Sequence, residues 1–213
     1  MGARVEHMLR GSVRALIDRD RALALHVIDL DRRIDELELE IDARCLRILA
    51  RWNPVASDLR FVTTALKLVT HIERIGDLAE SVSRHALELL KDERAITIGP
   101  VLMKLAQAAT ELVRDALDAF VARDTRGAEA TVERDRGVDA YYAQFFPELL
   151  QLMMAEPTRV SSLTRLQAIG KSFERIGDEA TNIAEMVPFM VEGTNVRHRA
   201  GTPASSSEEP GIH

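Results

Sequence analysis

Several residue types are scarce in this 213-residue sequence, and each scarcity excludes a class of protein. A single cysteine, Cys45, rules out an internal disulfide and fits a reducing compartment. No apolar run approaches the roughly 18 residues of a membrane span, and the first residues lack the apolar core of a signal peptide. The net charge is −6 and no strongly basic stretch offsets it, which argues against nucleic acid as a partner. The sequence therefore predicts a cytoplasmic protein.

Aromatic residues make up only 4% of the chain, while Ala, Leu, Arg, Glu and Asp dominate it, as is typical of a helix bundle. Glycine and proline are sparse, and the segments between them carry apolar residues at helical spacing. We expect helices over about residues 5–19, 22–51, 100–123 and 126–154. A third helix, capped by Asn53 or Ser57, is expected to end near Lys91, and a sixth runs from the break at 155–162 to about Met190.

The sequence ERIGD occurs twice, at residues 73–77 and 174–178. A shift of 101 residues superimposes the two copies, and a shift of 104 places DRRID (31–35) on DRGVD (135–139). Each half is then one three-helix unit. We predict an all-α fold of two tandem three-helix bundles, with repeats over residues 1–94 and 95–192. Residues 193–213, rich in Ser, Pro and Gly, are predicted to be a disordered tail.

Acidic side chains recur four residues apart on the second and third helices of each repeat. Two carboxylates at this spacing lie on one side of a helix and repel each other by roughly 0.2–0.5 kcal/mol. If the two helices are antiparallel neighbours, their pairs converge into a site of four carboxylates, and a bound cation turns the repulsion into coordination. Such oxygen-rich sites suit Mg²⁺, Ca²⁺, Mn²⁺ or iron. The four pairs are Asp31/Asp35, Glu73/Asp77, Asp135/Asp139 and Glu174/Asp178.

Residues outside these pairs are also assigned expected positions. Gly76 predicts a close approach of another helix, or of ions, to the backbone. His71 lies on the opposite side of its helix from Glu73 and is predicted to be solvent-exposed. The second helix is expected to bury a stripe formed by Val27, Leu30, Ile34, Leu37, Ile41 and Ile48. We expect packing rather than chemistry from Cys45, Trp52, Tyr141 and Tyr142.

Two other interpretations of the acidic pairs stay open. Pairs at this spacing are common on solvated helices, and Arg74 and Arg175 inside the ERIGD copies offer neutralising partners. In that case the chain is a structural helical adaptor without metal. The other alternative is a carboxylate-bridged, metal-dependent phosphohydrolase. No serine–histidine–acid set can be singled out, so the sequence predicts no catalytic residues and no enzyme.

Long stretches of the chain closely resemble the PhoU family of phosphate-signalling regulators. The resemblance rests on DRRID…NPVASDLRFVTTALKLVTHIERIGDLAESV and on DRGVD…SSLTRLQAIGKSFERIGDEATNIAEMV, and it covers about residues 5–192. It implies two three-helix bundles, each binding a multinuclear metal cluster through E(D)-x-x-x-D motifs. The sequence leaves the metal open between iron, zinc, manganese and magnesium. The implied ligands are Asp31, Asp35, Glu73 and Asp77 in the first bundle and Asp135, Asp139, Glu174 and Asp178 in the second.

The resemblance implies some further ligands less strongly. These weaker candidates are Glu80, Asp58, Asn182 and Glu185. At the positions equivalent to the last two, the first copy has Ser81 and Arg84. The cluster of the first bundle is therefore expected to be smaller or weaker than that of the second, with Glu80 as a substitute ligand.

The resemblance also implies a function. Members of the family restrain phosphate uptake and phosphate-starvation signalling when phosphate is plentiful. They act without turnover, as adaptors between the ATPase subunit of the phosphate ABC transporter and the sensor histidine kinase of a two-component system. Contact with the membrane is expected only through these partners, and a homodimer is expected because family members are commonly dimers.

Overall fold

A computed structural model of the chain describes residues 1–92 and 96–193. Over these ranges it contains six α-helices, one short 3-10 helix and no strand, which confirms the predicted all-α fold. The elements are α1 (Gly2–Ile17), α2 (Arg21–Trp52), α3 (Ala56–Leu89), α4 (Pro100–Ala122), α5 (Thr125–Ala155), η1 (Pro157–Arg159) and α6 (Val160–Glu192). No described helix combines the length and apolar character needed to cross a bilayer. The repeat boundary at residue 94 and the predicted tail beyond residue 193 lie outside the described residues.

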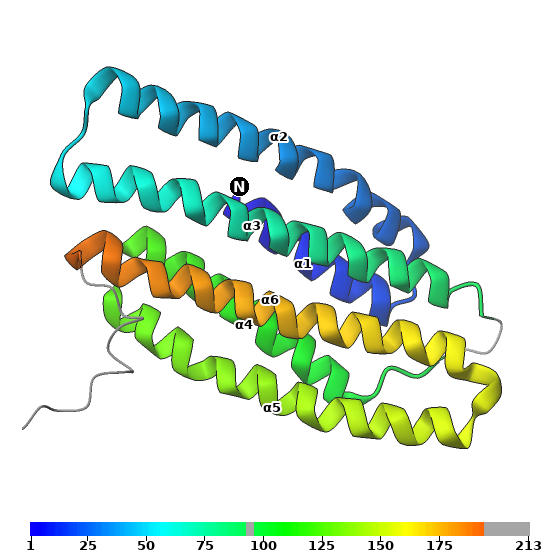
Figure 1. Cartoon of the computed structure of the whole chain (residues 1–213). Helices are drawn as coiled ribbons and strands as arrows, with labels where there is room; N and C mark the ends of the chain where they lie inside the picture. The colour runs from blue at the N-terminus through cyan, green and yellow to red at the C-terminus, as the bar shows by residue number, and fades with distance from the viewer. Residues whose placement is uncertain (93–95, 194–213) are drawn as a thin grey trace, which may run out of the picture.

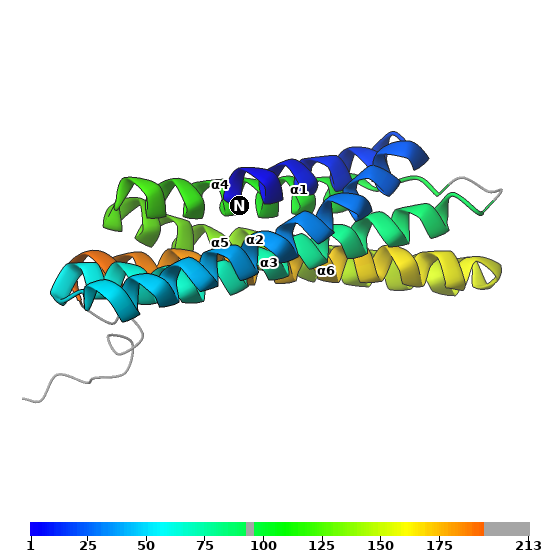
Figure 2. The same cartoon turned by 90° about the horizontal axis from the view of Figure 1, so that it is seen from above.

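The six helices form two layers. In one layer α2, α3, α6 and α5 lie side by side in that order, and α1 and α4 cover this layer from the same side (Figures 1 and 2). Because α1 packs on α2 and α3 while α4 packs on α5 and α6, each consecutive trio forms one bundle. The bundles meet chiefly along α3 and α6, which run antiparallel (Figure 1).

The repeat extends to the turns that precede α2 and α5. Asp20 Oδ1 accepts a hydrogen bond at 3.0 Å from the backbone N–H three residues further on, and Asp124 Oδ1 accepts one at 3.1 Å from the N–H two residues further on. These oxygens satisfy amide groups that have no partner inside the helix. The preceding residues, Arg19 and Arg123, both adopt a left-handed backbone with φ of 55°. The two turns therefore reverse the chain in the same way.

The start of α3 differs from its prediction. The residue before Ala56 is Val55, and no side chain caps the helix, so neither Asn53 nor Ser57 is its N-cap. Asn53 instead ends α2 in the left-handed conformation with φ of 42°. Asparagine tolerates this conformation because its short amide side chain can hydrogen-bond locally. The equivalent break before α6 contains η1, which the sequence pattern did not predict.

The predicted apolar stripe of α2 is buried over only part of its length. Val27, Ile34 and the predicted core residue Cys45 are buried, but 39% of Ile48 and 77% of Trp52 are exposed, so their predicted packing is wrong. The half-buried members of the stripe are Leu30, Leu37 and Ile41. The physical reason is length, since α1 spans 16 residues and α2 spans 32. At 1.5 Å per residue these helices are about 24 and about 48 Å long, so α1 cannot cover the far half of α2.

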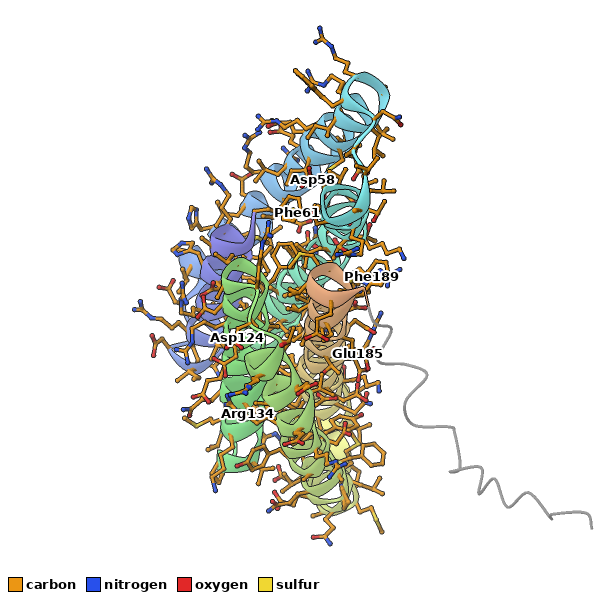
Figure 3. All side chains as sticks on the ribbon, turned by 90° about the vertical axis from the view of Figure 1, so that its left-hand side faces the viewer. Asp58, Phe61, Asp124, Arg134, Glu185 and Phe189 are labelled. Carbon is orange, nitrogen blue, oxygen red and sulfur yellow. The ribbon has the colours of Figure 1, made fainter. Side chains whose placement is uncertain are left out.

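Contacts along α3 and α6 fix the bundles against each other. At one end, the Arg60 guanidinium donates to the carbonyl oxygens of Met190 and Val191, the last turn of α6, at 3.4 and 3.5 Å. Beside it on α3, Phe61 stacks on Phe120 of α4 with ring centroids 6.2 Å apart (Phe61 is labelled in Figure 3). The two helices that carry the ERIGD copies are thereby held in one arrangement.

Candidate metal centres

Carboxylates converge between α2 and α3, in what we call the first cluster: Asp31, Asp35, Glu73 and Asp77. Asp31 and Asp35 lie one turn apart on α2 and Asp77 lies on α3, and one oxygen of each lies within 4.8 Å of the other two. A β-carbon on Gly76 would lie 3.4 Å from Ile34 Cγ2 and 3.5 Å from Asp31 Oδ1. These are ordinary van der Waals distances, so α2 packs beside Gly76 without the close approach predicted there. The equivalent Gly177 of the second copy does have a close neighbour, since a β-carbon there would lie 2.9 Å from Val138 Cγ1.

Burial and mutual repulsion favour the protonated form of the first cluster. Burial, followed by the charges of Glu80, Asp77 and Asp35, raises the pKa of Asp31 to about 6. Burial, followed by the charge of Asp77, raises the pKa of Glu73 to about 7. The pKa of Asp77 is raised as well, first by burial and then by the charge of Asp35. The pKa values of these carboxyl groups are raised because each would have to ionise beside other negative charges. A bound cation would favour their ionised, carboxylate form.

The first cluster fits a hard cation on chemical grounds. Its donors are all carboxylate oxygens, the ligands that Mg²⁺, Mn²⁺ and iron accept. Asp31 Oδ1 is buried without a hydrogen-bond partner. Among the described residues, no basic side chain forms an ion pair with any member of this cluster. Asp31, Asp35 and Asp77 are the residues placed to hold an ion, with Glu73 one turn before Asp77.

The second cluster is the matching set on α5 and α6: Asp135, Asp139, Glu174 and Asp178. In the described ranges, 1–92 and 96–193, no three of these residues bring their oxygens as close together as those of the first cluster. Burial, followed by the charge of Asp139, raises the pKa of Asp135, and burial, followed by the charge of Glu174, raises that of Asp178. The second cluster is therefore also repulsive, but no three of its described carboxylate oxygens converge as those of the first cluster do.

A lysine contacts the second cluster. Lys171 Nζ donates to Glu174 Oε1 at 2.7 Å and lies 2.6 Å from Oε2. The same ammonium lies 5.4 Å from the ring centroid of Tyr142, which packs half-buried against the core as predicted. This contact was not predicted from the sequence. A signal was present, because Lys171 precedes Glu174 by three residues, a spacing at which helical side chains meet.

The weaker candidates lie at the edges of the clusters or beyond them. Glu80 Oε1 accepts a hydrogen bond of 2.5 Å from Arg84, one turn further along α3. Asp58 lies in the first turn of α3 (Figure 3), about 22 Å along the helix from the ERIGD sequence, so it cannot share an ion with the first cluster. Asn182 and Glu185 are half-buried on α6, one and two turns beyond the second cluster (Glu185 is labelled in Figure 3).

His71 is not exposed to solvent as predicted. Its Nδ1 lies 2.5 Å from Glu179 Oε2 on α6, and only 17% of the His71 side chain is exposed. Arg74 Nη1 lies 3.6 Å from the other oxygen of the same carboxylate. The side of α3 opposite Glu73 faces the other bundle rather than water, and the pattern of a single helix does not contain that information. These three residues join the helices that carry the two clusters.

Two tandem three-helix bundles, each with an acidic cluster on its second and third helices, define a class of all-α repeat proteins with paired candidate cation sites. The sequence matches the PhoU domain twice, over residues 1–86 and 102–187. It is 39% identical to the phosphate-specific transport system accessory protein PhoU homolog of Pseudomonas aeruginosa over 198 residues. These aligned residues cover 93% of this chain and 82% of the relative. The homolog of the same name from Zymomonas mobilis is 38% identical over 199 residues, 93% of this chain and 84% of the relative. The chain belongs to the PhoU family.

Solved structures agree with this assignment. The crystal structure of PhoU from Pseudomonas aeruginosa matches with a TM-score of 0.87 at 39% identity, over 91% of this chain and 93% of that chain. The phosphate transport system regulatory protein PhoU from Streptococcus pneumoniae matches with a TM-score of 0.84 at 25% identity, over 92% of this chain and 91% of that chain. The tandem-bundle fold is therefore that of the family.

Proposed function

We propose that this chain restrains phosphate uptake and phosphate-starvation signalling, as an adaptor between the ATPase subunit of a phosphate ABC transporter and the sensor histidine kinase of a two-component system. The observation that carries the proposal is the match of both halves to the PhoU domain. The names of the relatives, accessory proteins of the phosphate-specific transport system, support it. An adaptor also agrees with a sequence in which no catalytic set can be singled out.

Metal binding is part of this proposal. The first cluster would hold one group of ions and the second cluster another, with oxygen ligands that favour manganese, magnesium or iron. Bound cations would neutralise the carboxylates and give these acidic helices a positive charge that anionic groups of a partner can contact. The convergence of three carboxylates and the unpartnered oxygen of Asp31 support the placement of ions in the first cluster.

Deletion of the gene tests the regulatory role. In phosphate-rich medium, we expect the deletion strain to express its phosphate-starvation genes and to take up labelled phosphate faster than the parent, and a plasmid copy to restore both. Pull-down from cells grown with and without phosphate is expected to recover the transporter ATPase and the kinase. Normal repression in the deletion strain would overturn the proposal. Turnover of phosphate esters that a chelator abolishes would favour a metal-dependent phosphohydrolase instead.

Metal analysis of the untagged, purified protein tests the centres independently of signalling. We expect stoichiometric metal in the wild type, loss of the first centre in Asp35→Asn/Asp77→Asn, and loss of the second in Asp139→Asn/Asp178→Asn. Glu36→Gln is the matched control, because Glu36 is an exposed carboxylate of α2 outside the clusters. A wild-type protein that contains no metal and takes up none would remove the metal part and leave the regulatory part standing.

A third experiment connects the two parts. If bound metal forms the partner surface, a variant that loses the metal also loses the pull-down of the kinase and transporter. Retained partner binding without metal would separate the clusters from signalling. The variant carries alanine at Glu73, Asp77, Glu174 and Asp178.

A further inference from the structure

Resting on the metal centres proposed above, we propose that Lys171 is a built-in competitor for the second centre. Its ammonium group neutralises Glu174 and has to leave that carboxylate before Glu174 can bind a metal ion. The second centre then binds divalent cations more weakly than the first, and the two centres fill in sequence as the metal concentration rises.

The contacts of Lys171 place its charge on a central ligand of the second cluster. Nζ donates to Glu174 Oε1 at 2.7 Å and lies 2.6 Å from Oε2, so the ammonium stands where an ion would bind this carboxylate. Oε2 itself is buried and accepts no hydrogen bond from the described residues. The side chain of Glu174 is 15% exposed, whereas that of Lys171 is 47% exposed. The carboxylate is therefore fixed in the protein, while the long, flexible lysine can move into solvent when a cation takes its place.

The charges around this pair explain why the lysine is held. The charge of Glu174 acts on Asp135 and on Asp178, and that of Asp139 acts on the same two groups. Lys171 is hydrogen-bonded to Glu174, and a lysine is cationic at neutral pH. The positive charge of Lys171 thus offsets part of the repulsion among the four carboxylates. A bound metal ion would offset the same repulsion.

The first bundle provides an internal comparison. The position equivalent to Lys171 is Thr70, whose hydroxyl donates to Glu38 Oε1 at 3.4 Å and carries no charge. The cation nearest to the first cluster by hydrogen bonding is Arg84, and it holds Glu80, outside the four carboxylates. Burial is the largest influence on the pKa of Asp31 and raises it, whereas the charge of Arg84 is the weakest and lowers it. No member of the first cluster is bonded to a cation in the described structure, whereas Glu174 of the second is bonded to Lys171.

Titration with Mn²⁺ tests the competition in the full chain. In an Asp35→Asn/Asp77→Asn background only the second centre can bind Mn²⁺. The concentration of free Mn²⁺ is measured by its electron paramagnetic resonance signal. Because a cation is removed from the ion's surroundings, Lys171→Met is expected to lower the dissociation constant by about tenfold or more. The matched control is Arg175→Met, which removes the same charge beside Glu174. Arg175 is exposed and forms no ion pair in the described structure, so a change below about threefold is expected.

The reciprocal variant moves the competitor to the first centre. In an Asp139→Asn/Asp178→Asn background, Thr70→Lys places an ammonium three residues before Glu73, and we expect the dissociation constant for Mn²⁺ to rise by about tenfold. Thr70→Met controls for the change of size.

The possible results distinguish a failure of the proposed competition by Lys171 from a failure of the proposed metal centres. Equal affinity of the Lys171→Met variant and its parent would overturn the competition and leave the centre intact. Absence of Mn²⁺ binding by both would overturn the competition and the centre together. Thermal unfolding gives a second readout. Without metal, Lys171→Met is expected to melt below its parent, and Mn²⁺ is expected to raise its melting temperature by more than it raises that of the parent; an equal rise would contradict the inference.

Discussion

The two bundles carry the same ERIGD sequence but surround it with different charges. In the first, no described basic side chain pairs with the four carboxylates, and the pKa of Glu73 is raised to about 7. In the second, the equivalent glutamate, Glu174, is bonded to Lys171. Acidic residues thus stand at matched positions in both copies, while their electrostatic surroundings differ. The two copies are therefore not expected to bind a cation equally.

The residue that distinguishes the bundles lies outside the motif, one turn before it. Sequence comparison predicted a weaker first cluster, because Ser81 and Arg84 replace two polar residues of the second copy. The structure leads us to infer the reverse order, since Arg84 is bonded to Glu80 and leaves the central carboxylates unpaired. The titrations of the Lys171 and Thr70 variants decide between the two orders.

The largest expected loss of stability comes from a substitution that disrupts the packing of the second bundle only. Gly170 of α6 is buried against Phe145 of α5, and a β-carbon there would lie 2.8 Å from the ring Cδ1 and closer still to Cε1. Gly170→Ala is therefore expected to lower the free energy of unfolding by about 3 kcal/mol, measured by urea denaturation. In the first bundle the equivalent positions hold Val69 and Ile41, so this bundle has no glycine at the position of Gly170.

Gly137→Ala is the control for this variant. Gly137 lies in α5, and a β-carbon at this position would have no neighbouring heavy atom within 4 Å. Alanine has the higher helix propensity, so this substitution is expected to stabilise the protein by about 0.5–1 kcal/mol. A Gly170→Ala protein as stable as the wild type would show that the two helices separate at little cost.

The next effect uses pH to compare the two glutamates of the ERIGD copies. Because the pKa of Glu73 is raised from 4.5 to about 7, the folded metal-free protein holds this proton more tightly than the unfolded chain. The associated stability is present below about pH 4.5 and is lost as the pH rises through about 7. Glu73→Gln removes this loss and is expected to stabilise the metal-free protein at about pH 8 by roughly 1–2 kcal/mol after solvent screening.

Thermal unfolding in the presence of a chelator measures this difference. The gain of Glu73→Gln over wild type is expected to shrink as the pH falls from about 8 to about 5. Glu174→Gln breaks the ion pair with Lys171, so no comparable stabilisation is expected from it. An equal gain in stability for both variants at about pH 8 would show that the electrostatic surroundings of the two glutamates do not differ.

A third comparison concerns the glycines of the two motifs. A β-carbon on Gly177 would lie 2.9 Å from Val138 Cγ1 and 3.1 Å from Asp135 Oδ1, whereas all the corresponding distances at Gly76 are at least 3.4 Å. Gly177→Ala is expected to destabilise the protein by about 1 kcal/mol, because the overlap outweighs the gain in helix propensity. Gly76→Ala is expected to be neutral or stabilising by up to about 1 kcal/mol. Denaturation of both variants in parallel checks the sign, and a larger loss at Gly76 would contradict it.

Features that depend on one helix, or on the repeat, could be predicted from the sequence. Helical spacing placed Asp31 and Asp35 on one side of α2, and the duplicated ERIGD sequence indicated two bundles. The cost of glycine inside a helix led us to predict a close approach at Gly76, but the structure shows that approach at the equivalent Gly177 instead.

Features that depend on how separate elements cover one another could not be predicted. The exposure of Trp52 follows from the length of α1 relative to α2, and the burial of His71 follows from the docking of α6 on the far side of α3. Neither is encoded in the periodicity of the helix that carries the residue. The contact of Lys171 is different, because its spacing from Glu174 lies within one helix and made the pair predictable.

The smallest expected effect compares the two junctions between α3 and α6. At one junction, Arg60 donates to the carbonyl groups at the end of α6; at the other, Arg165 forms a side-chain ion pair of 3.5 Å with Glu88. A cation near a helix C-terminus stabilises it by roughly 0.3–1 kcal/mol, and the hydrogen bonds of Arg60 are long. Arg60→Met is therefore expected to lower the free energy of unfolding by about 0.5 kcal/mol.

The control for Arg60→Met is Lys67→Met, which removes an exposed positive charge from the same helix. Hydrogen exchange adds spatial resolution, because faster exchange confined to the last turn of α6 is expected for Arg60→Met alone. If both variants lose the same stability and exchange alike, the effect of Arg60 is one of net charge. The bundles would then be held at that junction by apolar packing, with Phe61 and Phe120 as the contact to vary next.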